Sequence, residues 1–229
     1  MKAMRGAMKR IAQLGVMLMM GVGMNANAGL FGLGGTSWKE EVLLHDGTKI
    51  IVERQMKRGG RHEITSGPPI KEHSIDITMP GTGKTITWRD EYSEEVGSAS
   101  LLLLALHIGN NVPYLIASPY GCLAYNKYGR PNPPYVIFKH DGKEWQRIPL
   151  SELPMEFKTV NLVIGPSNEE KNLERLGTVS IAGVEAMNRD YRQPEYKTIL
   201  REPLERGRCP QYSSSPKAPI PIVPRVPEK

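Results

Sequence analysis

The chain has 229 residues, of which 39% are hydrophobic and 24% are charged, which is enough for one good-sized domain or two small ones. This composition excludes a membrane-spanning helical bundle, a coiled coil and a collagen-like protein. Gly (23) and Pro (19) are frequent, which favours short strands joined by many turns over long helices.

Residues 1–28 have the pattern of a secretory signal peptide. Four Lys and Arg residues precede the mostly apolar segment 11–22, and the small-residue site Ala26-Asn27-Ala28 follows it. The apolar segment is too short to span a bilayer, which requires roughly 20 residues. We therefore expect cleavage after Ala28 and a periplasmic or secreted mature protein without a transmembrane segment. The alternative is that this segment is a buried helix of the mature fold.

Cleavage changes the charge of the mature protein. The full chain has a formal net charge of +6, and loss of the four basic residues leaves 26 Lys and Arg against 24 Asp and Glu. A nucleic-acid-binding protein is expected to keep a basic stripe with interleaved aromatic side chains. The basic cluster at 57–62 is short and fits a solvated loop, so we expect no nucleic-acid partner.

Two hairpins are predicted in the first half of the mature chain. Residues 29–36 are Gly-rich and are predicted to form a flexible N-terminus. Asp46-Gly47 supplies the positive-φ residues that a tight hairpin requires. The Gly- and Pro-rich residues 56–71 are predicted to be a loop. The predicted strands are 38–44 and 49–55 around a turn at 45–48, then 74–78 and 85–88 around a turn at 80–84.

The next segment predicts four further strands. Residues 101–108 (LLLLALHI) fit a buried strand, although the periodicity of so short an apolar run does not exclude a helix that starts near Ser93. The remaining strands are 113–118, 135–139 and 144–150, with turns at 109–111 and 140–142 and a long loop at 119–135. Two four-stranded meanders predict a mainly β fold, either a β-sandwich or a propeller-like pair of sheets.

The pattern changes after Pro154. Residues 157–164 are predicted to form a last strand, and 167–176 and 180–191 are predicted helices. The β-rich domain with its C-terminal helices is therefore expected to span 37–209. Six of the last twenty residues, 210–229, are Pro, which predicts a disordered or polyproline tail.

Two cysteines, Cys122 and Cys209, remain in the mature chain. An even number of cysteines in an oxidising compartment favours one disulfide. The alternative is two free thiols.

The segment Pro80-Gly81-Thr82-Gly83-Lys84-Thr85 resembles the end of a phosphate-binding loop. That loop also needs Gly at its first position, a strand before it and a helix after it. Thr78 occupies the first position here, and β-branched and aromatic residues follow, so a hairpin turn explains the glycines and we expect no nucleotide. The five His residues have no metal-ligand spacing, and we expect no metal or other cofactor.

An envelope hydrolase or transferase is the alternative to a binding protein. Cys122 could serve as a thiol nucleophile, and Asp90, Glu91, Glu94 and Glu95 could supply paired carboxylates if the fold brings them together. The sequence places no base beside the thiol, so we favour a disulfide half for the cysteine and a solvated segment for the acids.

Residues 119–135 form the candidate binding region. This predicted loop is rich in Tyr and is stiffened by Pro131, Pro133 and Pro134. Long ordered loops on a β scaffold often carry recognition, and Tyr and Arg give large contact areas with few lost rotamers. The alternative is that the tyrosines cover a sheet edge and the prolines block edge pairing. The candidate binding residues are Tyr120, Tyr125, Asn126, Tyr128, Arg130 and Tyr135.

The same stretch, its continuation through residue 148 and the later segment 193–201 (QPEYKTILR) resemble an uncharacterised family of exported proteobacterial proteins. The resemblance covers most of the mature chain except the tail. It implies an envelope setting and brings no activity and no site residues. We predict a non-enzymatic binding or accessory protein of the cell envelope, whose partner is an envelope protein or a glycan.

Overall fold

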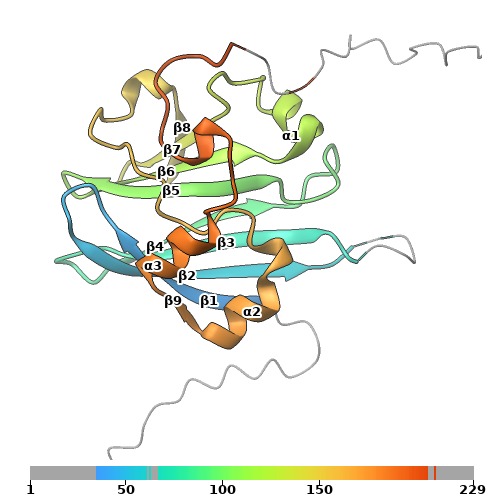
Figure 1. Cartoon of the computed structure of the whole chain (residues 1–229), viewed down its shortest axis with the longest axis horizontal. Coiled ribbons are helices and arrows are strands. Elements are labelled where there is room, and N and C mark those ends of the chain that lie inside the picture. The colour runs from blue at the N-terminus through green and yellow to red at the C-terminus, as the bar shows by residue number, and fades with distance from the viewer. Residues whose placement is uncertain (1–34, 61, 63–66, 206–208, 210–229) are drawn as a thin grey trace, which may run out of the picture. The chain divides into compact units, whose positions relative to one another are not determined.

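The computed structural model describes residues 35–60, 62, 67–205 and 209. The predicted signal peptide, residues 29–34 and the predicted tail 210–229 lie outside them. Nine strands lie in the described residues (Figure 1): β1 (Thr36–Leu43), β2 (Lys49–Arg58), β3 (Ile70–Thr78), β4 (Thr85–Glu91), β5 (Leu101–Gly109), β6 (Val112–Pro119), β7 (Val136–His140), β8 (Trp145–Ile148) and β9 (Thr178–Val179).

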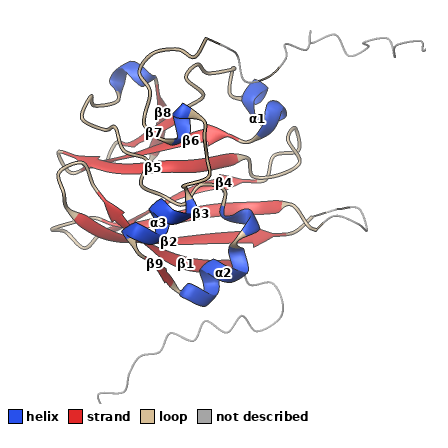
Figure 2. Ribbon diagram, in the orientation of Figure 1, coloured by secondary structure: helices blue, strands red, loops and turns tan. Residues whose placement is uncertain are grey.

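The helices in this part of the chain are short (Figure 2). They are α1 (Gly121–Lys127), α2 (Glu170–Leu176) and α3 (Ile181–Met187), with single 3-10 turns at Leu150–Glu152, Pro166–Asn168 and Pro194–Tyr196. None of the helices in the described residues is long and apolar enough to cross a membrane.

The strands form two sheets that are antiparallel except at one edge. The first sheet has the order β4-β3-β2-β1-β9, in which β9 pairs parallel with β1, and the second has the order β5-β6-β7-β8. Each sheet therefore contains one of the two predicted four-stranded meanders. The sheets pack face to face, which confirms a mainly β fold and identifies it as a sandwich with short helices.

Alternating side chains build the core between the two sheets. Val42, Val52 and Ile75 of the first sheet belong to the same buried cluster as Leu103 and Leu115 of the second. A β-bulge between Leu103 and Ala105 shifts the alternation within β5, and this strand is buried on both faces, by the first sheet on one and by the C-terminal part of the chain on the other. Burial on both faces explains why residues 101–108 are apolar without a period of two.

The second face of the β5–β8 sheet is covered by the C-terminal part of the chain. Leu104, Ile116 and Ile137 of the sheet pack against Phe157 and Ile199 in a second buried cluster. A third cluster joins α2 and α3 to one end of β1 and β2, through residues that include Trp38 and Leu173. The C-terminal segments therefore complete two hydrophobic cores that the hairpins alone leave open.

The prediction of a strand at 157–164 is wrong. In this segment the structure forms only an isolated bridge between Thr159 and Thr198. Asn161 takes the place of a ladder, because its side-chain Nδ2 donates to the Leu106 carbonyl oxygen over 2.8 Å and its Oδ1 accepts from the Leu106 N–H over 2.9 Å. One amide side chain thus pairs with the edge of β5 in an otherwise irregular segment.

Other boundaries also differ from the predictions. The prediction of a continuous loop at 119–135 is wrong, because α1 lies within it. The predicted loop 56–71 is shorter than expected, since β2 runs to Arg58 and β3 begins at Ile70. Both C-terminal helices are present, and α3 begins after Ser180, whose hydroxyl accepts from the N–H of Gly183.

A buried ion pair lies in the first sheet where the sandwich core meets the cluster under α2 and α3. The side chains of Glu40 and Arg54 are fully buried, and Arg54 Nη1 lies 2.7 Å from Glu40 Oε1. Glu40 also accepts from Trp38 Nε1 over 2.7 Å and from the Val163 N–H over 3.0 Å. Arg54 donates to the Val163 carbonyl oxygen over 2.8 Å and contacts His73 Nε2 at 2.9 Å. Every oxygen of the carboxylate therefore has a hydrogen-bond donor.

Removing one member of this pair is expected to destabilise the fold strongly. In Glu40→Ala, Arg54 would remain charged and buried without its carboxylate, which typically costs about 3–5 kcal/mol of unfolding free energy. The control is Glu72→Ala, whose partner Lys57 is 42% exposed, and whose loss is expected to cost less than about 1 kcal/mol. Urea unfolding of both variants tests this, and equal losses would contradict it.

The buried His107 makes the fold sensitive to acid. Burial lowers the pKa of His107 from 6.5 to about 4, while its Nε2 lies 2.9 Å from the Thr159 carbonyl oxygen. Burial, followed by the charge of Arg54, also lowers the pKa of His73 well below its usual value. Because these pKa values are lower in the folded state, the unfolded chain binds more protons below about pH 6.5.

The contribution of His107 to stability is therefore complete above about pH 6.5 and is lost as the pH falls towards 4. Wild-type protein is expected to lose about 2–3 kcal/mol more unfolding free energy than His107→Gln between about pH 7 and pH 4.5. Urea unfolding at the two pH values measures this difference. Parallel losses in the two proteins would show that His107 is not the titrating group.

Candidate binding groove

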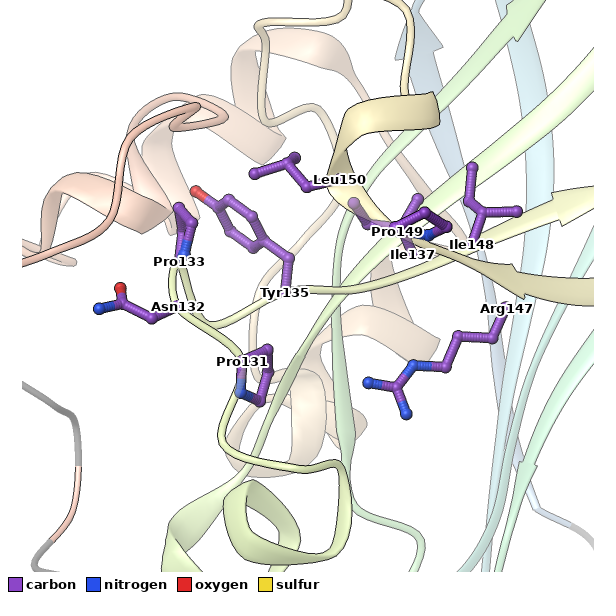
Figure 3. Close-up of a pocket in the computed structure, with 9 residues that line it drawn as sticks. All are labelled: Pro131, Asn132, Pro133, Tyr135, Ile137, Arg147, Ile148, Pro149 and Leu150. Atoms are coloured by element: carbon purple, nitrogen blue, oxygen red, sulfur yellow. The ribbon is translucent and has the colours of Figure 1, made fainter.

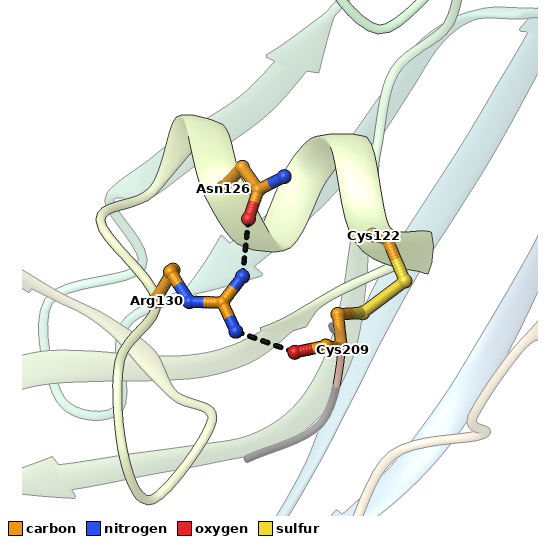
Figure 4. The surroundings of a disulfide bond; sticks show 4 residues. All are labelled: Cys122, Asn126, Arg130 and Cys209. Carbon is orange, nitrogen blue, oxygen red and sulfur yellow. Dashed lines mark hydrogen bonds between the residues drawn. A yellow bond between two sulfur atoms is a disulfide. The ribbon is translucent and has the colours of Figure 1, made fainter. Parts of the chain in front are cut away.

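A disulfide joins the first turn of α1 to the C-terminal part of the chain (Figure 4). Cys122 and Cys209 are bonded, with their Cα atoms 5.6 Å apart and a sequence separation of 87. The predicted cysteine pair is thus the pair that the structure brings together. In this bonded state Cys122 has no thiolate to act as a nucleophile.

Three of the predicted binding residues surround this disulfide. Arg130 donates through Nη1 to Asn126 Oδ1 over 2.6 Å and through Nη2 to the Cys209 carbonyl oxygen (Figure 4). Its guanidinium carbon lies 5.0 Å from the ring centroid of Tyr125, which is buried. These contacts attach α1 to the C-terminal part of the chain. The primary role of Tyr125, Asn126 and Arg130 is therefore structural.

Tyr135 immediately precedes β7 and anchors the C-terminal segment. Its hydroxyl oxygen is 3.1 Å from the carbonyl oxygens of Glu195 and Thr198 and accepts from the N–H of Leu200 over 3.1 Å. Burial raises the pKa of Tyr135 to about 12, so the phenol stays protonated and can donate. One side chain therefore connects the sheet to three positions of the segment that covers it.

Two cationic side chains contact the ring of Tyr128, and Tyr120 is exposed. Lys127 Nζ and the Arg147 guanidinium carbon each lie 5.7 Å from the centroid of the Tyr128 ring. Arg147 Nη2 also donates to the Tyr128 carbonyl oxygen over 2.8 Å. Burial raises the pKa of Tyr128 to about 12, so its ring stays neutral beneath these cations. Tyr120 precedes α1 and is 66% exposed.

A groove of about 400 Å³ lies beside this cluster, between the proline-rich segment 131–135 and the end of β8 (Figure 3). Its buried floor includes Tyr135 and Ile137, and its exposed rim includes Arg147. Figure 3 shows the Arg147 side chain extending towards Pro131. The lining residues are Pro131, Asn132, Pro133, Tyr135, Ile137, Arg147, Ile148, Pro149 and Leu150.

The wall of the groove is attached to the C-terminal segment by a reciprocal pair of hydrogen bonds. Asn132 Nδ2 donates to the Leu204 carbonyl oxygen over 2.9 Å, and Asn132 Oδ1 accepts from the Leu204 N–H over 2.7 Å. Together with the Tyr135 hydroxyl and the disulfide, this pair holds the segment from two sides. The groove therefore exists without a ligand to shape it.

The structure separates the predicted binding residues. Of the six, only Tyr135 lines the groove, whereas Tyr128 lies beneath Arg147. The second wall, residues 147–150, was not among the predicted binding residues. The signal that could have located it is the β7–β8 hairpin, whose register places Ile148 opposite Ile137.

The four acids that could supply paired carboxylates differ in their surroundings. Asp90 is buried and accepts from the N–H groups of Ser100 and Leu101 over 2.6 and 2.7 Å, although burial raises its pKa. Glu91, Glu94 and Glu95 are exposed. No group of three or more His, Cys, Asp or Glu side chains in the described part of the chain could hold a metal ion.

The phosphate-loop-like segment forms the predicted turn between β3 and β4. The N–H of Met79 donates to the carbonyl oxygen of Lys84, and the N–H of Gly83 donates to that of Met79. Both amides are thus used within the hairpin, and a strand rather than a helix follows.

No protein-family model, curated protein or solved structure matches the chain. The resemblance to exported proteobacterial proteins therefore stays a prediction.

Removing the disulfide is expected to destabilise the oxidised protein. The double variant Cys122→Ser/Cys209→Ser should lose about 2–5 kcal/mol of unfolding free energy, because the bridge constrains a long loop of the unfolded chain. Urea unfolding measures the loss, with dithiothreitol-treated wild type as the matched control that should unfold like the double variant. Identical unfolding of oxidised wild type and the double variant would contradict the prediction.

Proposed function

We propose that the mature protein is an exported binding module of the cell envelope that holds an extended peptide segment of another protein in the groove between residues 131–135 and 147–150. The observation that carries this proposal is the groove itself, with its apolar floor and a cationic rim. Its volume is within the range of sites that bury ligand side chains.

The lining exposes polar atoms about as much as apolar ones, which suits an extended peptide with its alternating main-chain and side-chain groups. Proline, isoleucine and leucine side chains and one tyrosine ring supply most of the wall. Burial of these apolar side chains contributes about 25 cal/mol per Å² to the affinity for a ligand.

The anchoring of the groove supports binding as a preformed site. Asn132 and Tyr135 are held by hydrogen bonds to the C-terminal segment, and α1 is held by the disulfide. A wall that is already ordered loses little conformational entropy when a ligand binds. The signal-peptide pattern and the disulfide both support an oxidising, extracytoplasmic location.

Selection of peptides tests the proposal. A phage-displayed library of random dodecapeptides is selected on the oxidised protein, and the affinities of the recovered peptides are measured by calorimetry. Ile148→Asp places a charge in the groove and is expected to weaken binding at least about tenfold. Because Ile148 is half-buried, Pro149→Glu on the exposed rim serves as a second variant that spares the fold.

The matched control is Ile51→Asp, which changes an equally apolar side chain that is 55% exposed on the other sheet. Its affinity for the recovered peptides is expected to equal that of the wild type. The proposal is wrong if no recovered peptide is sensitive to the two groove variants while remaining insensitive to the control.

A further inference from the structure

We infer that the occupant of this groove binds as an additional strand on β8 and places an Asp or Glu side chain on Arg147. This inference rests on the proposed function and specifies the partner as an extended, acidic segment of another envelope protein.

The first observation is that β8 is an unpaired edge. β8 has four residues and ends the second sheet, where it pairs only with β7. Among the described residues, no hydrogen bond reaches the backbone of Trp145–Ile148 from the side opposite β7. The outward N–H and carbonyl groups of an edge strand can pair with an incoming extended chain.

The opposite edge of the same sheet is closed. The side chain of Asn161 pairs with both backbone groups of Leu106, and the carbonyl oxygen of Leu104 accepts from the N–H groups of Asn161 and Leu162. The β4 edge of the first sheet is also contacted, because Trp145 Nε1 donates to the Thr87 carbonyl oxygen over 2.9 Å. Among these edges, β8 is the one that remains open.

The second observation is that the groove reaches around this edge. Successive residues of a strand project to opposite faces of the sheet. Arg147 and Ile148 are successive residues of β8, and both line the groove. The groove therefore contacts side chains from both faces of β8, and in the complex that we infer, the backbone of the occupant lies beside the strand between these two side chains.

The third observation concerns charge. Arg147 is exposed, and within the described residues its guanidinium makes no ion pair with an acid. The hydrogen bond from Nη2 to the Tyr128 carbonyl oxygen and the contact with the Tyr128 ring fix the position of the side chain. The remaining N–H groups can meet a carboxylate in the charge-assisted geometry that guanidinium groups favour. Lys127, on the same ring, adds a second positive charge.

The experiment uses the dodecapeptide that shows the largest affinity loss with Ile148→Asp. Four forms are compared by calorimetry on the oxidised full-length mature protein: the peptide itself, two forms N-methylated at alternate backbone positions in the two possible registers, and a form in which Asp and Glu are replaced by Asn and Gln. The protein variants are Arg147→Gln and the control Arg192→Gln, which removes an exposed guanidinium elsewhere on the surface.

Strand addition predicts that N-methylation in one of the two alternate registers weakens binding at least about thirtyfold, whereas the other register leaves it nearly unchanged. The Arg147–carboxylate contact predicts that the amide peptide and Arg147→Gln each weaken binding about tenfold, and that the combined change is not multiplicative. Arg192→Gln is expected to have no effect.

Three outcomes would overturn the inference and leave the proposed function intact. Equal affinity of both N-methylated peptides would exclude strand addition. A selected peptide without acids, or multiplicative losses, would exclude the carboxylate contact. In each case the sensitivity to Ile148→Asp would still support the groove. Failure of the proposed function itself is the separate result in which no peptide depends on the groove at all.

Discussion

The ion pair between Glu40 and Arg54 is the constraint that fixes how the rest of the chain is arranged. Both side chains are fully buried, and a charge in a low-dielectric interior must have its partners in place. Two of those partners are the N–H and carbonyl groups of Val163, which lies more than a hundred residues away in sequence. The C-terminal half of the chain must therefore cross the first sheet at this point for the pair to be satisfied.

The path of the chain on either side of Val163 follows from that crossing. Before it, Asn161 closes the edge of β5, and after it, α2 and α3 cover the adjoining end of the first sheet. The chain then returns across the outer face of the second sheet and reaches Tyr135 and Asn132. The position of the groove wall thus depends on the contact of Val163 with the first sheet. The disulfide attaches the C-terminal end of this segment to α1.

Much of the sandwich could be predicted from the sequence, because hairpins leave local signals. The turns at Asp46-Gly47 and Asp141-Gly142 are readable since glycine at positive φ is needed there, and Gly47 and Gly142 have φ values of 84° and 100°. Helix α1 escaped prediction because only Ala124 and Tyr125 are buried in it, so no apolar period marks it.

The groove lay beyond prediction for a different reason. Its walls come from two segments that meet only through the β7–β8 register and the attachment of Asn132 to Leu204. The prediction of a strand at 157–164 is wrong because the apolar residues of this segment are buried in three different clusters, whereas the pairing with β5 is made by the side chain of Asn161. Sequence periodicity records which residues are buried, and it does not record which group makes the hydrogen bonds.

The two edges of the second sheet differ, because β5 is covered and β8 is open. This difference limits how copies of this chain can associate through this sheet. Fibre growth by strand addition needs two open sheet edges on every subunit. Asn161 covers one of these edges, at β5. Two molecules could still pair edge to edge through β8, and that pairing would use the open edge of this sheet in the described residues. A sheet with one covered edge can accept one added strand, but it is poorly suited to the continued strand addition that builds a fibre.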